Sequence, residues 1–380
     1  MKDIIENTVE TLQIDKKNWT KVKFGAVAIQ QKKSVDRENT NLTRYVKGEH
    51  MGSQDLHLRE WGELTDEYLG PAFIRYFEKG DILYGSRRTY LRKVVIAPFE
   101  GITSNTTLVI KANEKLIDKR FLPFVMMSEG FTDHSIKNSK GSVNPYVNWK
   151  DLANYEFLLP PKAEQARLAD LLWAMDEVIE KEKEVLEKLN STTQIIFDNE
   201  INSIEGKYIP LSKILIPKSG KSQVPHERAK YIGLENIESG SFECNSYSDT
   251  SDVLAQCNII EPGDLCYSKL RPYLDKAFIA NFEAISTTEL LIFDTQNVSK
   301  EYVLFHLHSS PFLHYVTGKG FGTKMPRVSH KIIGDYEIKV PLDETVILNK
   351  LSSFQRNSKL VKAKISTSQS LQKSLINQIF

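Results

Sequence analysis

The chain has 380 residues, of which 41% are hydrophobic and 26% are charged, and this length can supply cores for two or three folded domains. Its 50 basic and 49 acidic side chains nearly cancel, so the overall charge does not indicate a nucleic-acid partner. Charged residues at the start argue against a signal peptide and no run approaches the roughly 18 apolar residues of a membrane span, so we expect a cytoplasmic protein without membrane contact.

In chain order, the first predicted domain covers residues 1–160, which carry a net charge of +3. Its apolar and β-branched runs at 93–97 and 108–111 predict strands, and 121–129 predicts a short helix. The segment 137–144 is rich in Ser, Asn, Gly and Lys, which is typical of a loop. This part of the chain is therefore predicted to be a mixed α/β domain.

A long helix is predicted next, over residues 161–205, which carry a net charge of −6. Pro160 and Pro161 end the preceding structure, and there is no Gly or Pro between Glu164 and Glu200. Apolar side chains recur there in alternating steps of four and three, as in the seam of a coiled coil. The predicted seam residues are Leu168, Leu172, Met175, Ile179, Leu186, Leu189 and Ile196, with a flanking stripe of Leu171, Val178 and Val185.

The second predicted domain covers residues 206–343, has a net charge of −1 and repeats the first. Shifted by 183 residues, the segment 80–110 aligns with 263–293 without a gap, and 13 of the 31 positions are identical. A further block, shifted by 181 residues, aligns the segments that end at Pro160 and Pro341. The chain is therefore a duplication. Strands are predicted at 276–280 and 289–294, a short helix at 301–309, and loops at 218–223 and 317–324.

The last segment, residues 344–380, is predicted to be a second long helix, with a net charge of +5. Its predicted seam residues are Leu351, Phe354, Val361, Ile365 and Leu375. Each helix by itself can simply cover its own domain, but the opposite charges of the two helices favour their pairing. The acidic residues predicted to face basic ones are Glu177, Glu180, Glu182, Glu184 and Glu187, against Lys350, Arg356, Lys359, Lys362 and Lys364.

These elements together predict the fold class. It is α/β (α+β), with two similar mixed α/β domains joined by two long antiparallel coiled-coil helices, and the internal repeat has pseudo-twofold symmetry. The antiparallel direction follows because a helix that leaves the first domain must pair with one that returns from the second.

Motifs for catalysis and cofactor binding are incomplete in this sequence. Gly220-Lys221-Ser222 lacks the earlier glycine of a phosphate-binding loop, and the glycines at 318–322 are followed by Pro326 instead of a helix. Asn144-Pro145-Tyr146 lacks the second proline of the Asn-Pro-Pro-Tyr motif of amino-methyltransferases. The three cysteines form no Cys-x-x-Cys pair, and neither His134 nor the group His306, His308 and His314 has acidic or cysteine partners at metal-ligand spacing. We therefore predict that the chain is not an enzyme and binds no cofactor or metal itself.

One segment resembles a known protein family. Residues 158–172 read Leu-Leu-Pro-Pro-Lys-Ala-Glu-Gln-Ala-Arg-Leu-Ala-Asp-Leu-Leu, which is similar to the Pro-Pro-x-x-Glu-Gln segment closing each recognition domain in specificity subunits of type I restriction-modification systems. Residues 19–25 resemble the opening of the first target-recognition domain in these subunits, and 209–214 the opening of the second. The second copy departs from the pattern, because residues 340–346 lack the Glu-Gln pair. The duplication, the two helices and the size agree with this family, so the resemblance covers essentially the whole chain.

The resemblance implies a division of the chain and a function. Residues 1–160 and 206–343 would be the two target-recognition domains, and 161–205 and 344–380 the two spacer helices. Each domain would read one half of a bipartite site in double-stranded DNA, without catalysis by this chain. The helix pair would set the gap between the halves and bind two methyltransferase subunits, which would use S-adenosylmethionine to methylate adenine. Restriction subunits would join this complex for cleavage.

The repeat also sorts the candidate DNA contacts. Residues identical in both copies cannot distinguish two different half-sites, so Arg88/Arg271, Tyr90/Tyr273 and Lys93/Lys276 either hold phosphate or pair with Asp81 and Asp264 inside the fold. Base readers are expected in the divergent loops, although any one of their charges can also be a solvated loop residue. The candidate DNA contacts of both kinds, to phosphate and to bases, in the first domain are Lys32, Lys33, Arg37, Arg44, Arg87, Arg88, Tyr90, Lys137, Lys140 and Asn144. Those in the second are Lys218, Lys221, Arg228, Lys269, Arg271, Tyr273, Lys319, Lys324 and Arg327.

Two other functions stay open on the sequence alone. The chain can be a coiled-coil adaptor or regulator that binds DNA or protein without directing methylation, or a nuclease or methyltransferase with a degenerate motif. Failure to copurify with a methyltransferase would favour the adaptor, and activity of the purified chain alone would favour the enzyme.

Overall fold

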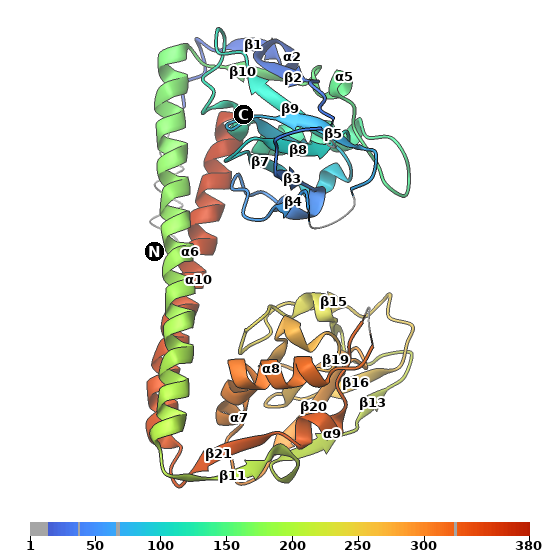
Figure 1. Ribbon diagram of the computed structural model, residues 1–380, viewed down its shortest axis with the longest axis vertical. Coiled ribbons are helices and arrows are strands. Elements are labelled where there is room, and N and C mark those ends of the chain that lie inside the picture. The colour runs from blue at the N-terminus through green and yellow to red at the C-terminus, as the bar shows by residue number, and fades with distance from the viewer. Residues whose placement is uncertain (1–13, 37–38, 66–68, 323–324) are drawn as a thin grey trace. The chain divides into compact units, whose positions relative to one another are not determined.

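The structure is a computed structural model that describes residues 14–36, 39–65, 69–322 and 325–380 (Figure 1). The chain divides into two compact units: the first contains the described residues up to Glu184 together with Lys362–Phe380, and the second contains Val185–Val361. Each unit therefore holds one domain and part of both long helices, whereas the sequence suggests that each helix is a segment of its own. No helix within the described ranges is long and apolar enough to cross a membrane.

The domain of the first unit is built from three sheets among its described residues. One pairs β1 (Thr20–Lys23) with β10 (Glu156–Leu159). The second has the order β2 (Ala28–Gln31), β9 (Thr107–Ala112), β6 (Ile82–Gly85), β7 (Val94–Ile96). The third has the order β4 (Gly62–Glu63), β3 (Arg44–Val46), β8 (Gly101–Ser104), β5 (Phe73–Phe77). The helical segments are α2 (Phe24–Val27), η1 (Gly48–His50), η2 (Thr89–Leu91), α3 (Leu122–Met127), α4 (Glu129–Lys137) and α5 (Trp149–Leu152).

The domain of the second unit has the corresponding sheets. One pairs β11 (Gly206–Pro210) with β21 (Glu337–Pro341). The second has the order β12 (Leu215–Lys218), β20 (Leu290–Thr295), β17 (Leu265–Ser268), β18 (Ala277–Ile279). The third has the order β13 (Lys221–Ser222), β16 (Cys257–Ile260), β19 (Ala284–Ser286), β14 (Lys230–Ile232), β15 (Ser248–Asp249). The helical segments are η3 (Leu211–Lys213), η4 (Leu234–Asn236), η5 (Pro272–Leu274), α7 (Lys300–Leu307), α8 (Ser310–Lys319) and α9 (His330–Gly334).

The common topology of the two units confirms the predicted duplication. The order β2-β9-β6-β7 corresponds to β12-β20-β17-β18, and β4-β3-β8-β5 corresponds to β15-β14-β19-β16. In both units one pair of strands in the third sheet is parallel, β3 with β8 and β14 with β19. The repeat extends to a turn that needs a positive φ, because Gly80 (φ 90°) and Gly263 (φ 87°) occupy corresponding positions before β6 and β17.

The four predicted strands are confirmed as β7, β9, β18 and β20, and the element boundaries elsewhere need correction. The helix predicted at 121–129 is α3, which ends at Met127. An unpredicted helix, α4, follows directly, and the side chain of Ser128 caps it by accepting a hydrogen bond from the N–H of Phe131. The helix predicted at 301–309 is α7, which ends at Leu307, and Ser309 caps the unpredicted helix α8 by accepting from the N–H of Phe312. The loop predicted at 317–324 begins later, since α8 continues to Lys319, and the segment 218–223 contains the short strand β13.

The long helices belong to the cores of the two units. In the first unit Leu172 and Ile379 are fully buried in the same cluster as Phe24 and Phe131 of the domain. In the second unit, Leu351 packs in one cluster with the domain side chains. Fully burying a leucine of this kind contributes about 1.5–3 kcal/mol, so each helix is held by its domains as well as by its partner helix.

The two long helices, α6 (Lys162–Ser203) and α10 (Thr345–Ile379), run antiparallel within each unit (Figure 1). Residue numbers rise along one helix and fall along the other at successive contacts. Those in the first unit are Leu172 O with Gln372 Nε2 (3.3 Å) and Glu182 with Lys364 (3.2 Å). Those in the second unit are Asn190 with Ser358 (3.0 Å) and Glu200 with Lys350 (2.6 Å).

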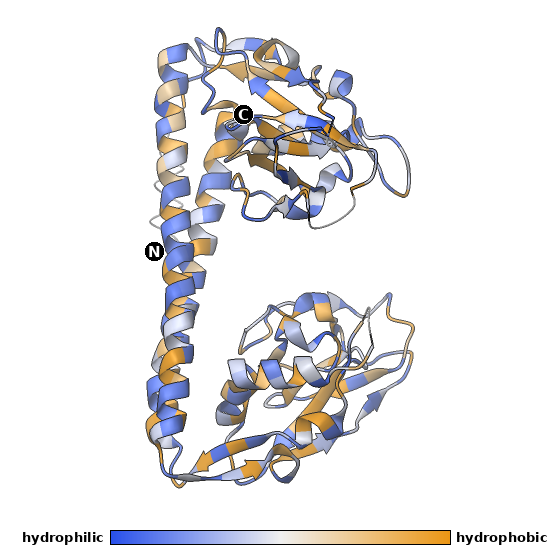
Figure 2. Cartoon of the chain, viewed as in Figure 1, coloured by the Kyte–Doolittle hydropathy of each residue, from blue (hydrophilic) through white to orange (hydrophobic). Residues whose placement is uncertain are grey.

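The predicted seam residues differ in burial along the helices. The buried ones are Leu168, Leu172, Ile179, Leu351 and Leu375. The half-buried ones are Met175, Leu186, Leu189, Ile196, Phe354, Val361 and Ile365. The flanking stripe of Leu171, Val178 and Val185 is exposed, and both helices carry hydrophilic residues along their length (Figure 2).

The charge complementarity predicted between the helices needs correction, because two of these charges contact the domains and Glu177 pairs with Lys181 of its own helix. Glu182 does face Lys364 of the other helix. In contrast, Glu180 pairs with Arg59 at 2.7 Å, and Lys359 pairs with Glu243 at 2.8 Å. The long side chains reach across to the nearest domain, and the opposite charges therefore attach helices to domains as well as helix to helix.

The start of α6 is fixed by Gln165, the last residue of the Pro-Pro-x-x-Glu-Gln segment. Its side chain is buried, donates to the carbonyl of Pro160 (2.8 Å) and accepts from the backbone N–H of Asp118 (2.7 Å). In the second unit Glu344 accepts from the backbone N–H of Ser299 (3.0 Å), and Ser299 corresponds to Asp118 by the shift of 181 residues. The second copy therefore lacks the Glu-Gln pair but keeps a side chain that ties the start of its long helix to the same position of the domain.

Candidate nucleic-acid interface

In the first unit, two segments far apart in the sequence lie side by side beyond the end of β6. Residues 86–92 follow β6 and contain η2, and residues 138–147 form a hairpin in which Lys140 and Tyr146 exchange backbone hydrogen bonds of 2.8 and 2.9 Å. The N–H of Val147 donates to Ser86 O at 2.9 Å, and the N–H of Arg88 donates to a carbonyl of the hairpin at 2.6 Å. We call these two segments the first loop pair.

The second unit contains the same arrangement beyond the end of β17. Residues 269–275 contain η5, and Phe321 and Arg327 exchange backbone hydrogen bonds of 2.9 Å in the segment 319–328. The N–H of Val328 donates to Lys269 O at 2.9 Å, which corresponds to the bond from Val147 to Ser86. We call these two segments the second loop pair, of which residues 323–324 lie outside the described ranges.

Both loop pairs place an arginine in the left-handed backbone region. Arg88 has φ 50° and Arg271 has φ 49°, a conformation that costs a residue with a side chain about 1–2 kcal/mol. The same backbone bonds hold both arginines, from their N–H groups to Pro145 O (2.6 Å) and Pro326 O (2.7 Å). Their side chains are exposed.

A tyrosine accompanies each arginine. Tyr90 is 53% exposed and Tyr273 is 51% exposed, while the residues between arginine and tyrosine, Thr89 and Pro272, are buried. Burial of the middle residue anchors the turn and leaves the arginine and the tyrosine accessible. The two units therefore present the same pair of side chains on the same backbone.

The alternative in which the repeated cations pair with Asp81 and Asp264 is wrong. Asp81 lies 3.6 Å from Lys111 and also accepts from the backbone N–H of Glu78. Asp264 pairs with Lys218 at 2.6 Å. The repeated lysines Lys93 and Lys276 instead donate to the backbone carbonyls of Gly48 and Leu234. These two lysines stabilise the fold. The repeated arginines are not needed to neutralise Asp81 or Asp264, because each aspartate already has a lysine partner.

Several other candidates have partners inside their own unit. In the first unit the pairs are Arg44 with Glu63 (3.5 Å), Arg88 Nε with Asn144 (2.9 Å), Lys140 with Asp151 (3.6 Å), and Lys33 over the ring of Tyr76 (4.1 Å). In the second they are Lys218 with Asp264, Lys221 with Asn258, Arg228 with Glu261, Arg327 with Glu289 (3.1 Å), and Lys319 over Tyr315 (4.4 Å). These side chains contribute charge to the surface, and each already has one partner in its own unit, which for Arg88 involves Nε alone.

A smaller set has no side-chain partner among the described residues. Its members are Lys32, Arg87, Tyr90, Lys137, Lys269, Arg271 and Tyr273. All except Lys32 lie in or next to a loop pair. Arg37 and Lys324 lie outside the described residues.

The loop pairs also contain exposed aromatic side chains that the sequence reasoning missed. Tyr146 is 43% exposed and Phe321 is 57% exposed, and both belong to the paired backbone of their hairpins. Aromatic rings among basic residues are common where proteins contact nucleic acid. Tyr146 follows Pro145 at the start of the aligned block that ends at Pro160, which was a usable signal, whereas Phe321 lies before the corresponding block.

A group of three candidate metal ligands in the first unit is a salt-bridge network instead. Asp55, His57 and Glu180 have ligand atoms within 4.8 Å of one another. However, Arg59 contacts Glu180 at 2.7 Å and Lys183 contacts Asp55 at 3.7 Å, so positive side chains already neutralise both carboxylates. The network attaches the segment around Asp55 to α6.

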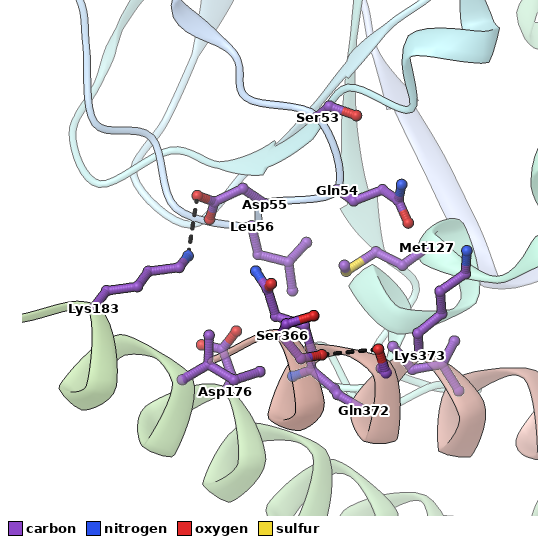
Figure 3. Close-up of a pocket in the computed structure, with 14 residues that line it drawn as sticks. Ser53, Gln54, Asp55, Leu56, Met127, Asp176, Lys183, Ser366, Gln372 and Lys373 are labelled. Carbon is purple, nitrogen blue, oxygen red and sulfur yellow. Dashed lines mark hydrogen bonds and ion pairs between the residues drawn. The ribbon is translucent and has the colours of Figure 1, made fainter. Parts of the chain in front are cut away.

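A polar cavity of about 330 Å³ lies beside this network, between the domain and both helices within the first unit (Figure 3). Its lining carries both signs of charge, with Asp55, Asp176, Lys183 and Lys373 among the side chains drawn. His57 lies next to it and contacts Asp176 at 2.7 Å, and this hydrogen bond raises the pKa of His57 above its ordinary value.

Comparisons with known proteins relate this chain to one family. Residues 16–191 match the family model described as the type I restriction modification DNA specificity domain. The specificity subunit of the type I restriction enzyme EcoDI from Escherichia coli is 30% identical over 183 residues, 47% of this chain and 40% of that subunit. The specificity subunit of the type I restriction enzyme MjaVIII from Methanocaldococcus jannaschii is 24% identical over 280 residues, 64% of each chain. Both matches span less than two thirds of the relative.

The fold has a solved counterpart. The crystal structure of a type I restriction-modification S subunit from M. genitalium has a TM-score of 0.51 and 16% identity, covering 97% of this chain and 98% of that one. At this identity the likeness concerns the fold, which is shared over nearly the whole chain.

Proposed function

We propose that this chain, which belongs through residues 16–191 to the family of type I restriction-modification DNA specificity domains, is a specificity subunit that directs its enzyme to a bipartite DNA sequence. The family match carries this proposal for the first unit. The duplicated fold extends it to the second unit, whose loop pair has the same backbone as the first. Each unit reads one half of the site in duplex DNA.

The remaining parts of the proposal concern the complex. The chain itself is non-catalytic and works in the cytoplasm. The helix pair sets the spacing of the half-sites and binds two methyltransferase subunits, which carry S-adenosylmethionine and methylate adenine. Restriction subunits join the same complex for cleavage. The incomplete catalytic motifs of the sequence support a subunit that leaves the chemistry to its partners.

The base readers are proposed to lie in the divergent parts of the loop pairs and next to them. Arg87, Lys137 and Lys269 are the strongest candidates, because they have no side-chain partner among the described residues and are not repeated in the other unit. Arginine and lysine bind guanine edges through N7 and O6, and each such contact discriminates by about 1–3 kcal/mol.

The test is the methylated sequence itself. Adenine methylation is mapped across the genome of a host that expresses the chain with its methyltransferase, and in a host with the methyltransferase alone. We expect a bipartite motif that requires the chain. Replacing residues 1–160 by those of a relative should change one half of the motif and leave the other unchanged. A complex that forms without producing any motif would contradict the proposal and favour a regulatory adaptor.

A further inference from the structure

The near-neutral chain has an excess of basic residues in the two loop pairs. By sequence, the first loop pair has four basic residues and no acidic one, and the second has five basic residues and one acidic one, Asp275. Three of these cations pair with acids outside the loop pairs, Arg92 with Glu129, Lys140 with Asp151 and Arg327 with Glu289, whereas Arg87, Arg88, Lys269 and Arg271 have no acidic partner among the described residues. Asp275 hydrogen-bonds to His308 at 2.7 Å. A locally basic surface of this kind attracts the phosphate backbone of nucleic acid even when the net charge of the protein is close to zero.

Within these surfaces, Arg88 and Arg271 have no structural reason to be arginine. Both stand in the left-handed backbone region, where glycine or asparagine is favoured and a long side chain is not. The only side-chain bond of Arg88 among the described residues goes from Nε to Asn144, and the corresponding residue of the second unit is Met325. Arg271 has no side-chain partner in the described part of the chain. Packing thus does not account for an arginine at both positions.

The surroundings of the repeated residues differ between the units, although the residues themselves do not. Arg87 corresponds to Leu270, Thr89 to Pro272 and Arg92 to Asp275, while arginine and tyrosine recur at the positions between them. A residue that reads a base is expected to differ when the half-sites differ. A residue that binds the sugar–phosphate backbone meets the same chemistry in every sequence and can stay the same.

We propose, building on the proposed function, that Arg88 with Tyr90 and Arg271 with Tyr273 are matched, sequence-independent clamps for a DNA phosphate, one in each unit. The strained turn holds each arginine at the surface, and its terminal Nη groups have no partner among the described residues, so they can donate to phosphate oxygens. The half-exposed tyrosine supplies a hydroxyl donor two residues away. The clamps fix how each unit sits on the backbone, and the neighbouring divergent residues then read the bases.

The experiment replaces the arginines by glycine, which removes the side chain and suits the backbone. Binding of the full-length chain to a duplex of arbitrary sequence and to the duplex carrying its methylation motif is measured by fluorescence anisotropy over a range of KCl concentrations. The variants are Arg88→Gly, Arg271→Gly and the double substitution. Lys79→Ala is the matched control, since Lys79 is an exposed cation at the opposite end of β6 without a side-chain partner in the described residues.

Each single glycine variant should weaken binding to both duplexes by about tenfold, and the slope of log affinity against log salt should become shallower by about 0.9. The double variant should lose about a hundredfold, because the two arginines lie in separate units. The melting temperature should stay the same or rise, since glycine relieves the unfavourable φ. Lys79→Ala should leave affinity and slope nearly unchanged.

Other results would overturn the inference in distinct ways. A loss confined to the motif-bearing duplex, with unchanged salt dependence, would make the arginines base readers. A lower melting temperature with unchanged affinity would make them structural. If the wild-type chain bound neither duplex, with or without its methyltransferase, the proposed function itself would fail and the clamps with it.

Discussion

At the residue scale, Gln165 shows how one amide can hold a helix to a domain. Replacing it by leucine would leave the carbonyls of Pro160 and Leu116 and the N–H of Asp118 without their buried partner. We expect Gln165→Leu to lower the free energy of unfolding by about 2–4 kcal/mol, measured by urea denaturation. Gln194→Leu on the same helix, which removes a part-buried contact to Asp198, should cost less than about 1 kcal/mol. Equal losses in both variants would refute this role of Gln165.

His57 gives the first unit a stability that depends on pH. Its pKa is raised by the hydrogen bond to Asp176, so the folded protein binds the proton more tightly than the unfolded chain. The resulting stabilisation is complete below the unfolded pKa of about 6.5 and is lost as the pH rises through the higher pKa of the folded state. We therefore expect His57→Asn to destabilise the protein more at about pH 6 than at about pH 8.5.

The control for His57 removes its partner. In an Asp176→Asn background, the effect of His57→Asn on the free energy of unfolding should differ less between the two pH values, because the hydrogen bond to Asp176 is the largest cause of the raised pKa. A difference that survives undiminished in this background would assign the effect to another group near the histidine, such as Glu180 or Asp55.

At the scale of elements, the helix pair contains a buried charge. Glu182 is 6% exposed, and its contact is with Lys364, whose Nζ lies 3.2 Å away. Lys364→Ala should lower the free energy of unfolding by about 1–3 kcal/mol, because it leaves a buried carboxylate without a counter-charge. Lys359→Ala, which breaks an exposed pair with Glu243, should cost at most about 1 kcal/mol.

A double variant tests whether the unpaired charge of Glu182 causes the expected loss of stability. Adding Glu182→Leu to Lys364→Ala should restore most of the lost stability in urea denaturation, because a leucine in the seam needs no counter-charge. Additive losses in the double variant would show that Lys364 acts through its aliphatic stem and not through Glu182.

The long helices could be predicted from sequence because their periodicity is local, whereas the partners of their charges could not. The heptad spacing of Leu168, Leu172 and Ile179 is visible in the chain itself. Which acidic residue meets which cation depends on the domain surface that the helix lies on, so Glu180 pairs with Arg59, 121 residues away. The helices α4 and α8, which begin directly after Ser128 and Ser309, were missed because a serine N-cap is a weak signal inside an apolar run.

For the candidate site, the sequence predicted which segments form it but not which side chains in them contact each other. The repeat identified Arg88 and Arg271 because identity between the copies needs no structure. The sequence did not predict whether a particular loop cation is already paired. Arg228 binds Glu261, while Arg271 has no such partner in the described chain. Sequence patterns report which charges are present, and only the fold decides which of them are already neutralised.

At the scale of the whole molecule, the two units share both long helices. The length of the helix pair should therefore set the number of base pairs between the two half-sites. Seven residues inserted into α6 after Asn190 and into α10 after Ser358 keep the seam period and lengthen both helices by about 10 Å. Under the proposed function, methylation mapping should then show both half-sites unchanged and a spacer longer by about three base pairs, at 3.4 Å per pair. The same insertion in α6 alone displaces its seam against α10 and should abolish methylation or destabilise the chain. An unchanged spacer in the double insertion would mean that the helix pair does not set the spacing.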